Sequence, residues 1–305
     1  MDEAEKPPLF CSFLHLQGKQ FEAFGQTPNG DTEDEKLMDY LFMLVGGVIA
    51  GLFGSLLGLG GGVLIIPMLT LIFGVPMKQA IGTSLICVIA TSSGAASLYV
   101  KKHLADIRLG MTLELATTMG AIVGGLVAGL INPEVLTILF SLLLFYIALS
   151  MIRKRAEGGS VGNPAKGGEG NSSVQGDYRV TNLPFGMGAS FFAGNISGLL
   201  GVGGGVIKVP AMYLLMGIPL KTAVATSNFM IGVTATAGAF VYYARGEVDF
   251  LISGSTMIGV FVGALIGSRV LHLVKMEYLK KTFVIVLLYL SVEMLFKGFH
   301  LRFLF

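Results

Sequence analysis

Long runs without charged residues dominate the hydrophobic pattern of the chain. Residues 40–77 contain no Asp, Glu, Lys or Arg. As a single helix this run would measure about 57 Å at 1.5 Å per residue, whereas the hydrocarbon core of a membrane is about 30 Å thick. The run is too long for one crossing and too short for two, and its glycines cluster within residues 58–62. The pattern therefore predicts a long helix, a break at these glycines, and a short second segment that ends before Lys78.

Further apolar segments follow, most of them at or near the length of a membrane helix. They are residues 79–100, 109–131, 135–152, 183–200, 206–217, 222–244, 250–268 and about 282–296. Two polar stretches separate the apolar regions, and we interpret them as an acidic tail and a flexible Gly-rich linker. The predicted organisation is a tail (residues 1–39), a first transmembrane repeat (40–152), a cytoplasmic linker (153–182) and a second transmembrane repeat (183–305). The fold class is an all-α polytopic membrane protein with five segments per repeat, the second of which is short.

The two halves of the chain are an internal repeat. Residues 51–106 align without gaps on residues 194–249, a shift of 143, and are identical at 20 of 56 positions. The shared residues include Pro, Lys, a Thr-Ser pair and Asp in one register, which low complexity does not readily produce. Repeats of this kind are typical of secondary transporters, whose substrate site lies at the repeat interface near the middle of the membrane.

The orientation of the two repeats can be argued from Lys and Arg, which favour cytoplasmic loops. If all five segments of each half cross the membrane, the repeats are inverted; if the short segments dip and return, the repeats are parallel. We expect inversion, because Arg245 lies beside two acidic residues and makes a poor cytoplasmic loop.

Composition excludes several classes of protein. Hydrophobic residues make up 53% of the 305 residues and charged residues only 13%, about half of the usual share in soluble domains. A soluble enzyme, a secreted disulfide scaffold and a disordered chain do not fit, and the net charge of +2 gives no reason to expect nucleic acid as a partner. We expect a multi-pass protein of the cell (inner) membrane, with lipid around it.

The repeated strings GLGGGVLIIP with GVPMKQAIGTS, and GVGGGVIKVP with GIPLKTAVATS, resemble the sulfite exporter TauE/SafE family, also called the 4-toluene sulfonate uptake permease family. The resemblance covers about residues 40–300 without the linker. It implies a permease for small anions, notably sulfite, organosulfonates and related sulfur compounds, with no prosthetic group. It fixes neither the substrate nor the direction of transport.

The glycine clusters are the first candidate site for such an anion. Helix N-termini offer unpaired N–H groups and a partial positive charge, and glycine lets the backbone approach closely. Each cluster opens a short segment, and tight helix packing is the alternative interpretation. The candidate glycines are Gly60, Gly61, Gly62, Gly203, Gly204 and Gly205.

Lys208 is the strongest single candidate for contact with an anion. It lies in an otherwise apolar segment, and its repeat mate is Ile65. A cation within the membrane is costly and indicates function; the alternatives are that Lys208 reaches the surface or pairs with an acid. Glu114 and Glu293 are the available acids, and Glu114 is a candidate for a coupling proton or an ion pair.

Other polar residues within the spans complete the candidate site. Asn195 and Asn228 have Leu52 and Leu85 as repeat mates, so they add polarity to the second half alone. Hydroxyls that could donate to an anion, or instead cap or back-bond a helix, are on Thr83, Ser84, Thr226 and Ser227. The sequence indicates no metal cluster and no nucleophile with a base.

The function predicted from the sequence is secondary transport of a small sulfur-containing anion by alternating access. An anion channel lined by the same residues is the first alternative, and a membrane enzyme or a scaffold for one is the second, which lacks a recognisable catalytic set. Proton or sodium coupling and the oligomeric state stay open.

Overall fold

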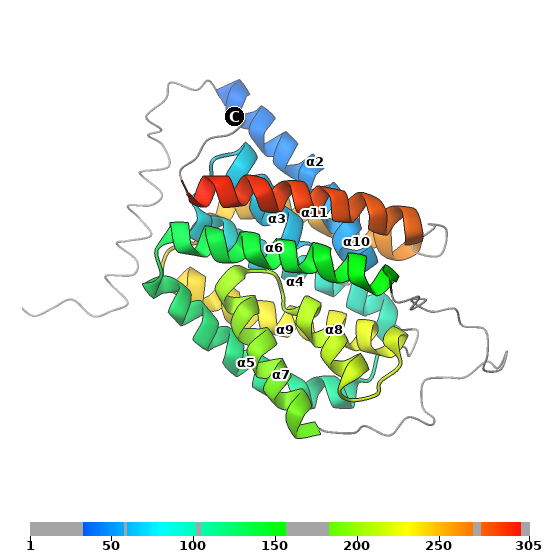
Figure 1. The fold of residues 1–305 in the computed structure, drawn as a ribbon. Coiled ribbons are helices and arrows are strands. Elements are labelled where there is room, and N and C mark those ends of the chain that lie inside the picture. Colours follow the sequence, from blue (N-terminus) through cyan, green and yellow to red (C-terminus); the bar gives the residue numbers. More distant parts are fainter. Residues whose placement is uncertain (1–32, 58–59, 102–104, 157–182, 271–275, 300–305) are drawn as a thin grey trace, which may run out of the picture.

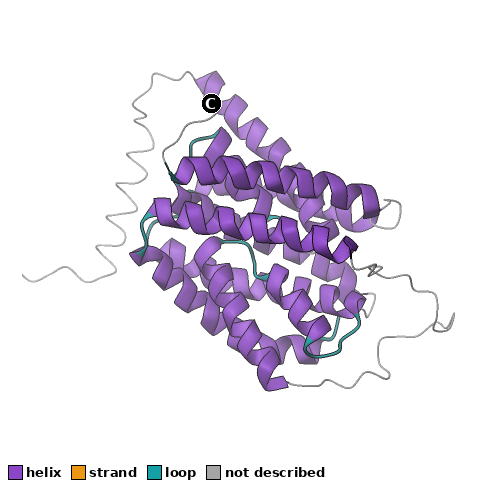
Figure 2. Ribbon diagram, viewed as in Figure 1, coloured by secondary structure: helices purple, strands orange, loops and turns teal. Residues whose placement is uncertain are grey.

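The computed structural model describes residues 33–57, 60–101, 105–156, 183–270 and 276–299, and every regular element in these ranges is a helix (Figure 2). The helices lie within a few residues of the predicted segments, which confirms the all-helical prediction. They are α2 (Glu33–Leu57), α3 (Gly62–Pro67, extended by a π-helical turn, Met68–Ile72), α4 (Met77–Lys101), α5 (Ile107–Leu130), α6 (Pro133–Ala156), α7 (Leu183–Leu200), α8 (Gly205–Leu214), α9 (Leu220–Ala244), α10 (Phe250–Val270) and α11 (Met276–Gly298).

The predicted tail and linker fall largely outside the described residues. α2 already includes residues 33–39, and α6 includes residues 153–156. The rest of the tail, up to residue 32, and residues 157–182 of the linker lie outside the described ranges.

Corresponding helices of the two repeats begin with the same local chemistry. The carboxylate of Asp106 accepts a hydrogen bond from the backbone N–H of Leu109 (3.0 Å) at the start of α5. Asp249, its repeat mate, accepts from the N–H groups of Leu251 (2.9 Å) and Ile252 (3.1 Å) at the start of α10. A carboxylate at this position satisfies N–H groups that the helix itself leaves unpaired.

The helices pack in pairs that join the two repeats. α2 packs on α10, and α5 packs on α7, so each pair takes one helix from each repeat. α4 packs on α9, its own repeat mate, while α6 and α11 are also mates and run side by side (Figure 1). Exchange of the repeats turns the pair α2–α10 into the pair α7–α5, so the packing pattern is the same from either half.

The mixed pairs are held at direct contacts between backbones. A Cβ atom built on Gly124 of α5 would lie 2.0 Å from the carbonyl oxygen of Asn195, and one built on Gly198 of α7 would lie 2.0 Å from that of Ala121. The other pair is equally close, since a Cβ on Gly263 of α10 would lie 2.0 Å from the carbonyl oxygen of Val48. Small residues permit this close approach between membrane helices, so the glycines set the distance between the paired helices.

The outer surface of the bundle is largely apolar, and many of the hydroxyl groups lie inside. Leu130 is 88% exposed and Phe185 is 73% exposed, whereas Thr83, Thr117 and Thr234 are completely buried. Six helices in the described ranges are long and apolar enough to cross a membrane, namely α2, α4, α5, α6, α9 and α10. Lipid is the solvent that covers such a surface, and the chain is a multi-pass membrane protein.

Replacement of Gly124 by Ala tests the backbone contact between α5 and α7. The added Cβ has no room beside the carbonyl of Asn195, and we expect G124A to lower stability by about 1–3 kcal/mol, as overpacking does. The matched control is G188A on α7, where a Cβ meets nothing within 4 Å and Ala favours the helix. Thermal unfolding in detergent measures both. Equal melting temperatures for G124A and the unmodified protein would contradict the tight contact.

Candidate functional site

The two glycine loops adopt a backbone conformation that favours glycine. Gly60 and Gly61 precede α3 with φ values of 79° and 78°. Gly203 and Gly204 precede α8 with φ values of 84° and 71°. Residues with a Cβ are strained at positive φ. In each repeat, these glycines therefore allow the chain to turn between a long helix and the short helix that follows.

Both loops contact the same two side chains at the centre of the bundle. A Cβ on Gly60 would lie 3.1 Å from Val88 Cγ1 and 3.3 Å from Ile231 Cγ2. A Cβ on Gly203 would lie 2.9 Å from Ile231 Cγ2 and 3.0 Å from Val88 Cγ1. Because Val88 of α4 and Ile231 of α9 are repeat mates, the two broken segments meet at one point shared by both repeats.

The hydroxyls beside the two loops are used differently. Ser84 donates to the carbonyl of Gly201 (2.9 Å) and so joins α4 to the second loop. The buried hydroxyls of Ser227, the repeat mate of Ser84, and of Ser197 have no hydrogen-bond partner in the described structure. Ser197 lies beside the second loop, since its Cβ is 3.3 Å from a Cβ built on Gly204. An uncommitted hydroxyl, that of Ser197, therefore lies beside the loop of the second repeat.

Lys208 of α8 lies in a buried polar cluster with α5 and α9. Its ammonium donates to the hydroxyl of Thr234 (2.6 Å) and lies 3.5 Å from Glu114 Oε2. The side chain of Lys208 is 0% exposed and that of Glu114 is 8% exposed. Lys208 therefore pairs with an acid and does not reach the surface, and Glu114 is the acid that it meets.

The carboxylate of Glu114 accepts from three threonines. Thr234 donates to Oε1 (2.6 Å), and Thr117 and Thr118 approach Oε2 and Oε1 at 3.2 Å and 3.3 Å. Several donors and a nearby cation are the conditions under which a buried carboxylate remains charged. The cluster is thus a connected network of one cation, one anion and three hydroxyls.

The repeat-related site, formed by the mates of these residues, lacks this cluster. The 143-residue shift places Ile65, Met257, Val260 and Phe261 opposite Lys208, Glu114, Thr117 and Thr118. Only Thr234 keeps its residue type, in Thr91, and each of these hydroxyls lies within hydrogen-bond distance of the carbonyl four residues earlier. The repeat-related site, which also takes residues from both halves, is therefore built without these charges, so the helix packing itself does not require them.

Three further residues predicted for the site make hydrogen bonds outside the Lys208 and Glu114 cluster. Thr83 shares a hydrogen bond with Ser253 (3.1 Å), and the hydroxyl of Thr226 accepts from the backbone N–H of Asp106 (2.9 Å). Asn228 donates to its own helix at Val224 (3.0 Å), while its Oδ1 is buried and has no partner in the part of the chain described.

Gly62, Gly205 and Asn195 differ in what surrounds them. Gly62 lies against Gly201 and the hydroxyl of Ser84, and Gly205 is the first residue of α8. Asn195 lies on α7, where its backbone packs on α5. The two loops and Ser84 thus meet at Val88 and Ile231, while Lys208 and Glu114 form the buried polar cluster.

Sequence reasoning did not single out Thr117, Thr118, Thr234 or Ser197. Threonine and serine are common in membrane helices, where they bond their own backbone, so their presence alone carries little signal. The available signal was the difference between the repeats, since Thr117 and Thr118 align with the apolar residues Val260 and Phe261. The two threonines also follow Glu114 by three and four residues, which places them on the same helix face.

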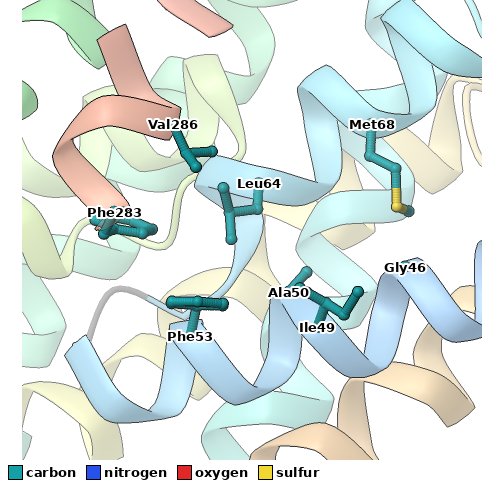
Figure 3. Close-up of a pocket in the computed structure, with 8 residues that line it drawn as sticks. All are labelled: Gly46, Ile49, Ala50, Phe53, Leu64, Met68, Phe283 and Val286. Atoms are coloured by element: carbon teal, nitrogen blue, oxygen red, sulfur yellow. The ribbon is translucent and has the colours of Figure 1, made fainter. Parts of the chain in front are cut away.

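A separate cavity of about 240 Å³ lies between α2, the α3 segment and α11 (Figure 3). Its lining carries no polar side chain, and the rings of Phe53 and Phe283 stack across it with centroids 6.0 Å apart. The lining residues are Gly46, Ile49, Ala50, Phe53, Leu64, Met68, Phe283 and Val286. An anion needs donors or positive charge, so this cavity does not suit one.

Comparison with known proteins gives consistent matches along most of the chain. The family described as Sulfite exporter TauE/SafE matches residues 43–294. A probable membrane transporter protein, YunE of Bacillus subtilis, is 29% identical over 274 residues, which cover 86% of this chain and 99% of YunE. A probable membrane transporter protein of Xylella fastidiosa is 28% identical over 223 residues, or 73% of this chain and 81% of the relative. No solved structure matches the chain.

The repeat comparison yields a stability test of the buried pair. K208I and E114M introduce the residues that the repeat mates carry. Each single change leaves one buried charge unpaired, and we expect a loss of about 3–5 kcal/mol. In the double variant both charges are gone, and stability should return to within about 1 kcal/mol of the unmodified protein, because apolar replacement of a buried pair is often neutral.

Thermal unfolding of the unmodified protein, the two single variants and the double variant measures this coupling. A double variant whose loss equals the sum of the two single losses would show that Lys208 and Glu114 do not interact.

Proposed function

Because the chain belongs to the sulfite exporter TauE/SafE family, we propose that it is a secondary transporter of a small sulfur-containing anion, sulfite or a short organosulfonate. It is a membrane transporter of this family; the anion and the alternating-access mechanism are the proposal. The observation that carries the proposal is Lys208, a fully buried cation on a short helix that begins at a glycine loop.

The surroundings of Lys208 support an anion site. The N-cap of α8 is Gly204, and no side chain caps this end of the helix. Backbone N–H groups at such an end favour negative charge. The hydroxyl of Ser197, which lies beside the loop that opens α8, and the hydroxyl of Ser227 on α9 lack partners among the described residues, and we propose them as further donors of the kind that sulfonate oxygens accept. The site proposed is thus formed by the two glycine loops, Lys208 and these hydroxyls, with Asn195 and Asn228 at its margin.

The helix pairing supports alternating access. The pairs α2–α10 and α5–α7 are each held by backbone contacts at glycine, which are too close to slide without separating the helices. We propose that each pair moves as a rigid unit; the broken segments meet at Val88 and Ile231. We propose that the repeats are inverted, and that rocking of one pair against the other about this contact exposes the site to each side in turn.

Uptake into proteoliposomes tests the transported class. The panel contains sulfite, thiosulfate, sulfate, sulfoacetate, taurine, methanesulfonate and isethionate, with acetate as the carboxylate control. We expect saturable uptake of at least one sulfur anion and little uptake of acetate. Single-channel currents in a planar bilayer would instead favour the channel alternative, and uptake of acetate alone would contradict the substrate class.

A matched set of variants tests the role of Lys208 in the same assay. The double variant K208I with E114M removes the cation without leaving an unpaired charge, and we expect at least a tenfold loss of uptake. The control is K101M, since Lys101 is exposed in the last turn of α4, and it should transport normally. Unchanged uptake by a folded double variant would remove Lys208 from the site.

A further inference from the structure

The buried charges of the interior sum to zero. Among the buried side chains of the described ranges, Lys208 and Glu114 are the only members of the Lys, Arg, Asp and Glu set. They lie 3.5 Å apart, so the pair is neutral as a unit. An anion that joined this pair would leave the interior with a net charge of −1. Uncompensated charge is costly within a membrane, so anion binding needs one positive charge to arrive as well.

The hydroxyls around Glu114 allow the carboxyl group to change charge in place. A threonine hydroxyl has one proton to donate and can also accept. Thr234 lies within reach of two acceptors, Glu114 Oε1 (2.6 Å) and the carbonyl of Met230 (3.0 Å). Thr117 likewise has Glu114 Oε2 (3.2 Å) and the carbonyl of Leu113 (2.8 Å). If Glu114 gains a proton, both hydroxyls can turn to these carbonyls, and the new O–H can donate to Thr234.

The elements packed around Glu114 bring few other charges to it. α7 packs on α5 and contains no acidic, basic or histidine residue. α8 contributes Lys208, and α9 contributes the uncharged Thr234. Lys221 precedes Thr234 by thirteen residues on α9, or about 20 Å at 1.5 Å per residue. In the described ranges, Glu114 is therefore the group beside Lys208 that can take up a proton from acid.

We propose that one proton and one monovalent anion occupy this site together, the proton on the Glu114 carboxylate and the anion on the Lys208 ammonium. This inference rests on the proposed function and adds its coupling ion. In the empty site, Glu114 carries −1 and Lys208 carries +1. In the loaded site, Glu114 is neutral, Lys208 carries +1 and the anion carries −1. The proton comes from the water on the side of entry and leaves to the water on the other side.

Constant buried charge has two consequences. Transport is electroneutral, so a proton gradient drives the anion and the membrane potential does not. Monovalent anions are the substrates, because a divalent anion would again leave the loaded site at −1. The site therefore fits a sulfonate or hydrogensulfite, and it disfavours sulfate.

Methanesulfonate and isethionate are the probes of choice, because a sulfonate keeps its single charge across the pH range. Sulfite changes its own charge near neutral pH and would confuse the result. Uptake into proteoliposomes is followed together with internal pH, with the membrane potential set by a potassium gradient and valinomycin. We expect one proton to enter with each anion, about tenfold accumulation per unit of pH difference, and no effect of the potential.

E114Q removes the proton from the cycle and leaves a neutral hydrogen-bonding side chain in its place. Loading then adds the anion's charge alone, so internal pH should stay constant during uptake and transport should become electrogenic. A potential of 100 mV corresponds to 2.3 kcal/mol per elementary charge, and we expect it to change the accumulation of anion about 50-fold. The control is E134Q, since Glu134 is exposed at the start of α6, and it should keep the coupling of the unmodified protein.

The outcomes separate this inference from the proposed function. Uptake of a sulfonate without proton entry, or uptake of divalent anions alone, overturns the inference and leaves the transport function standing. No uptake of any sulfur anion overturns both. E114Q that still carries one proton per anion overturns the inference, and if E114Q does not fold, the stoichiometry of the unmodified protein decides.

Discussion

Backbone-to-backbone contact at glycine is the constraint on which the rest of the structure depends. Lipid gives no hydrophobic advantage to helix association, so close packing must supply it. Gly124 and Gly198 bring α5 onto α7, and Gly263 brings α10 onto α2. These contacts join helices from different halves of the chain. They also position α5 beside α8 and α9, so that Glu114 reaches Lys208 across 94 residues of sequence.

Charge neutrality is the second constraint. It applies to the site of Lys208 and Glu114 and not to the repeat-related site. The helix arrangement can be mapped onto itself by exchange of the repeats, yet Lys208 and Glu114 have Ile65 and Met257 as mates. A symmetric scaffold thus carries an asymmetric chemical group. Because the repeat-related site packs without charges, the presence of Lys208 and Glu114 at this site points to chemistry that a packed interior alone does not need.

The sequence predicts the elements well and their partners poorly. The apolar runs define the helices because membrane thickness fixes their length, and the glycines in residues 58–62 mark the break before α3. The pairing of α2 with α10 depends on three-dimensional contacts that no local pattern contains. Within the site, Lys208 stands out by its charge, but the choice of Glu114 over Glu293 as its partner is a matter of helix packing.

The shared contact of both glycine loops with Val88 and Ile231 bears on how the two halves diverged after duplication. Val88 and Ile231 are repeat mates, and each lies against both glycine loops. A larger side chain at either position therefore acts on both loops at once. The two side chains, Val88 and Ile231, differ by a single methylene group. Away from Val88 and Ile231, residues can pack beside partners other than their own repeat mates. At such positions, one copy can change without a change in the other. Lys208 and Glu114 occupy such positions, one in each repeat, so the duplicated scaffold carries a charged pair at one site and apolar residues at the repeat-related site.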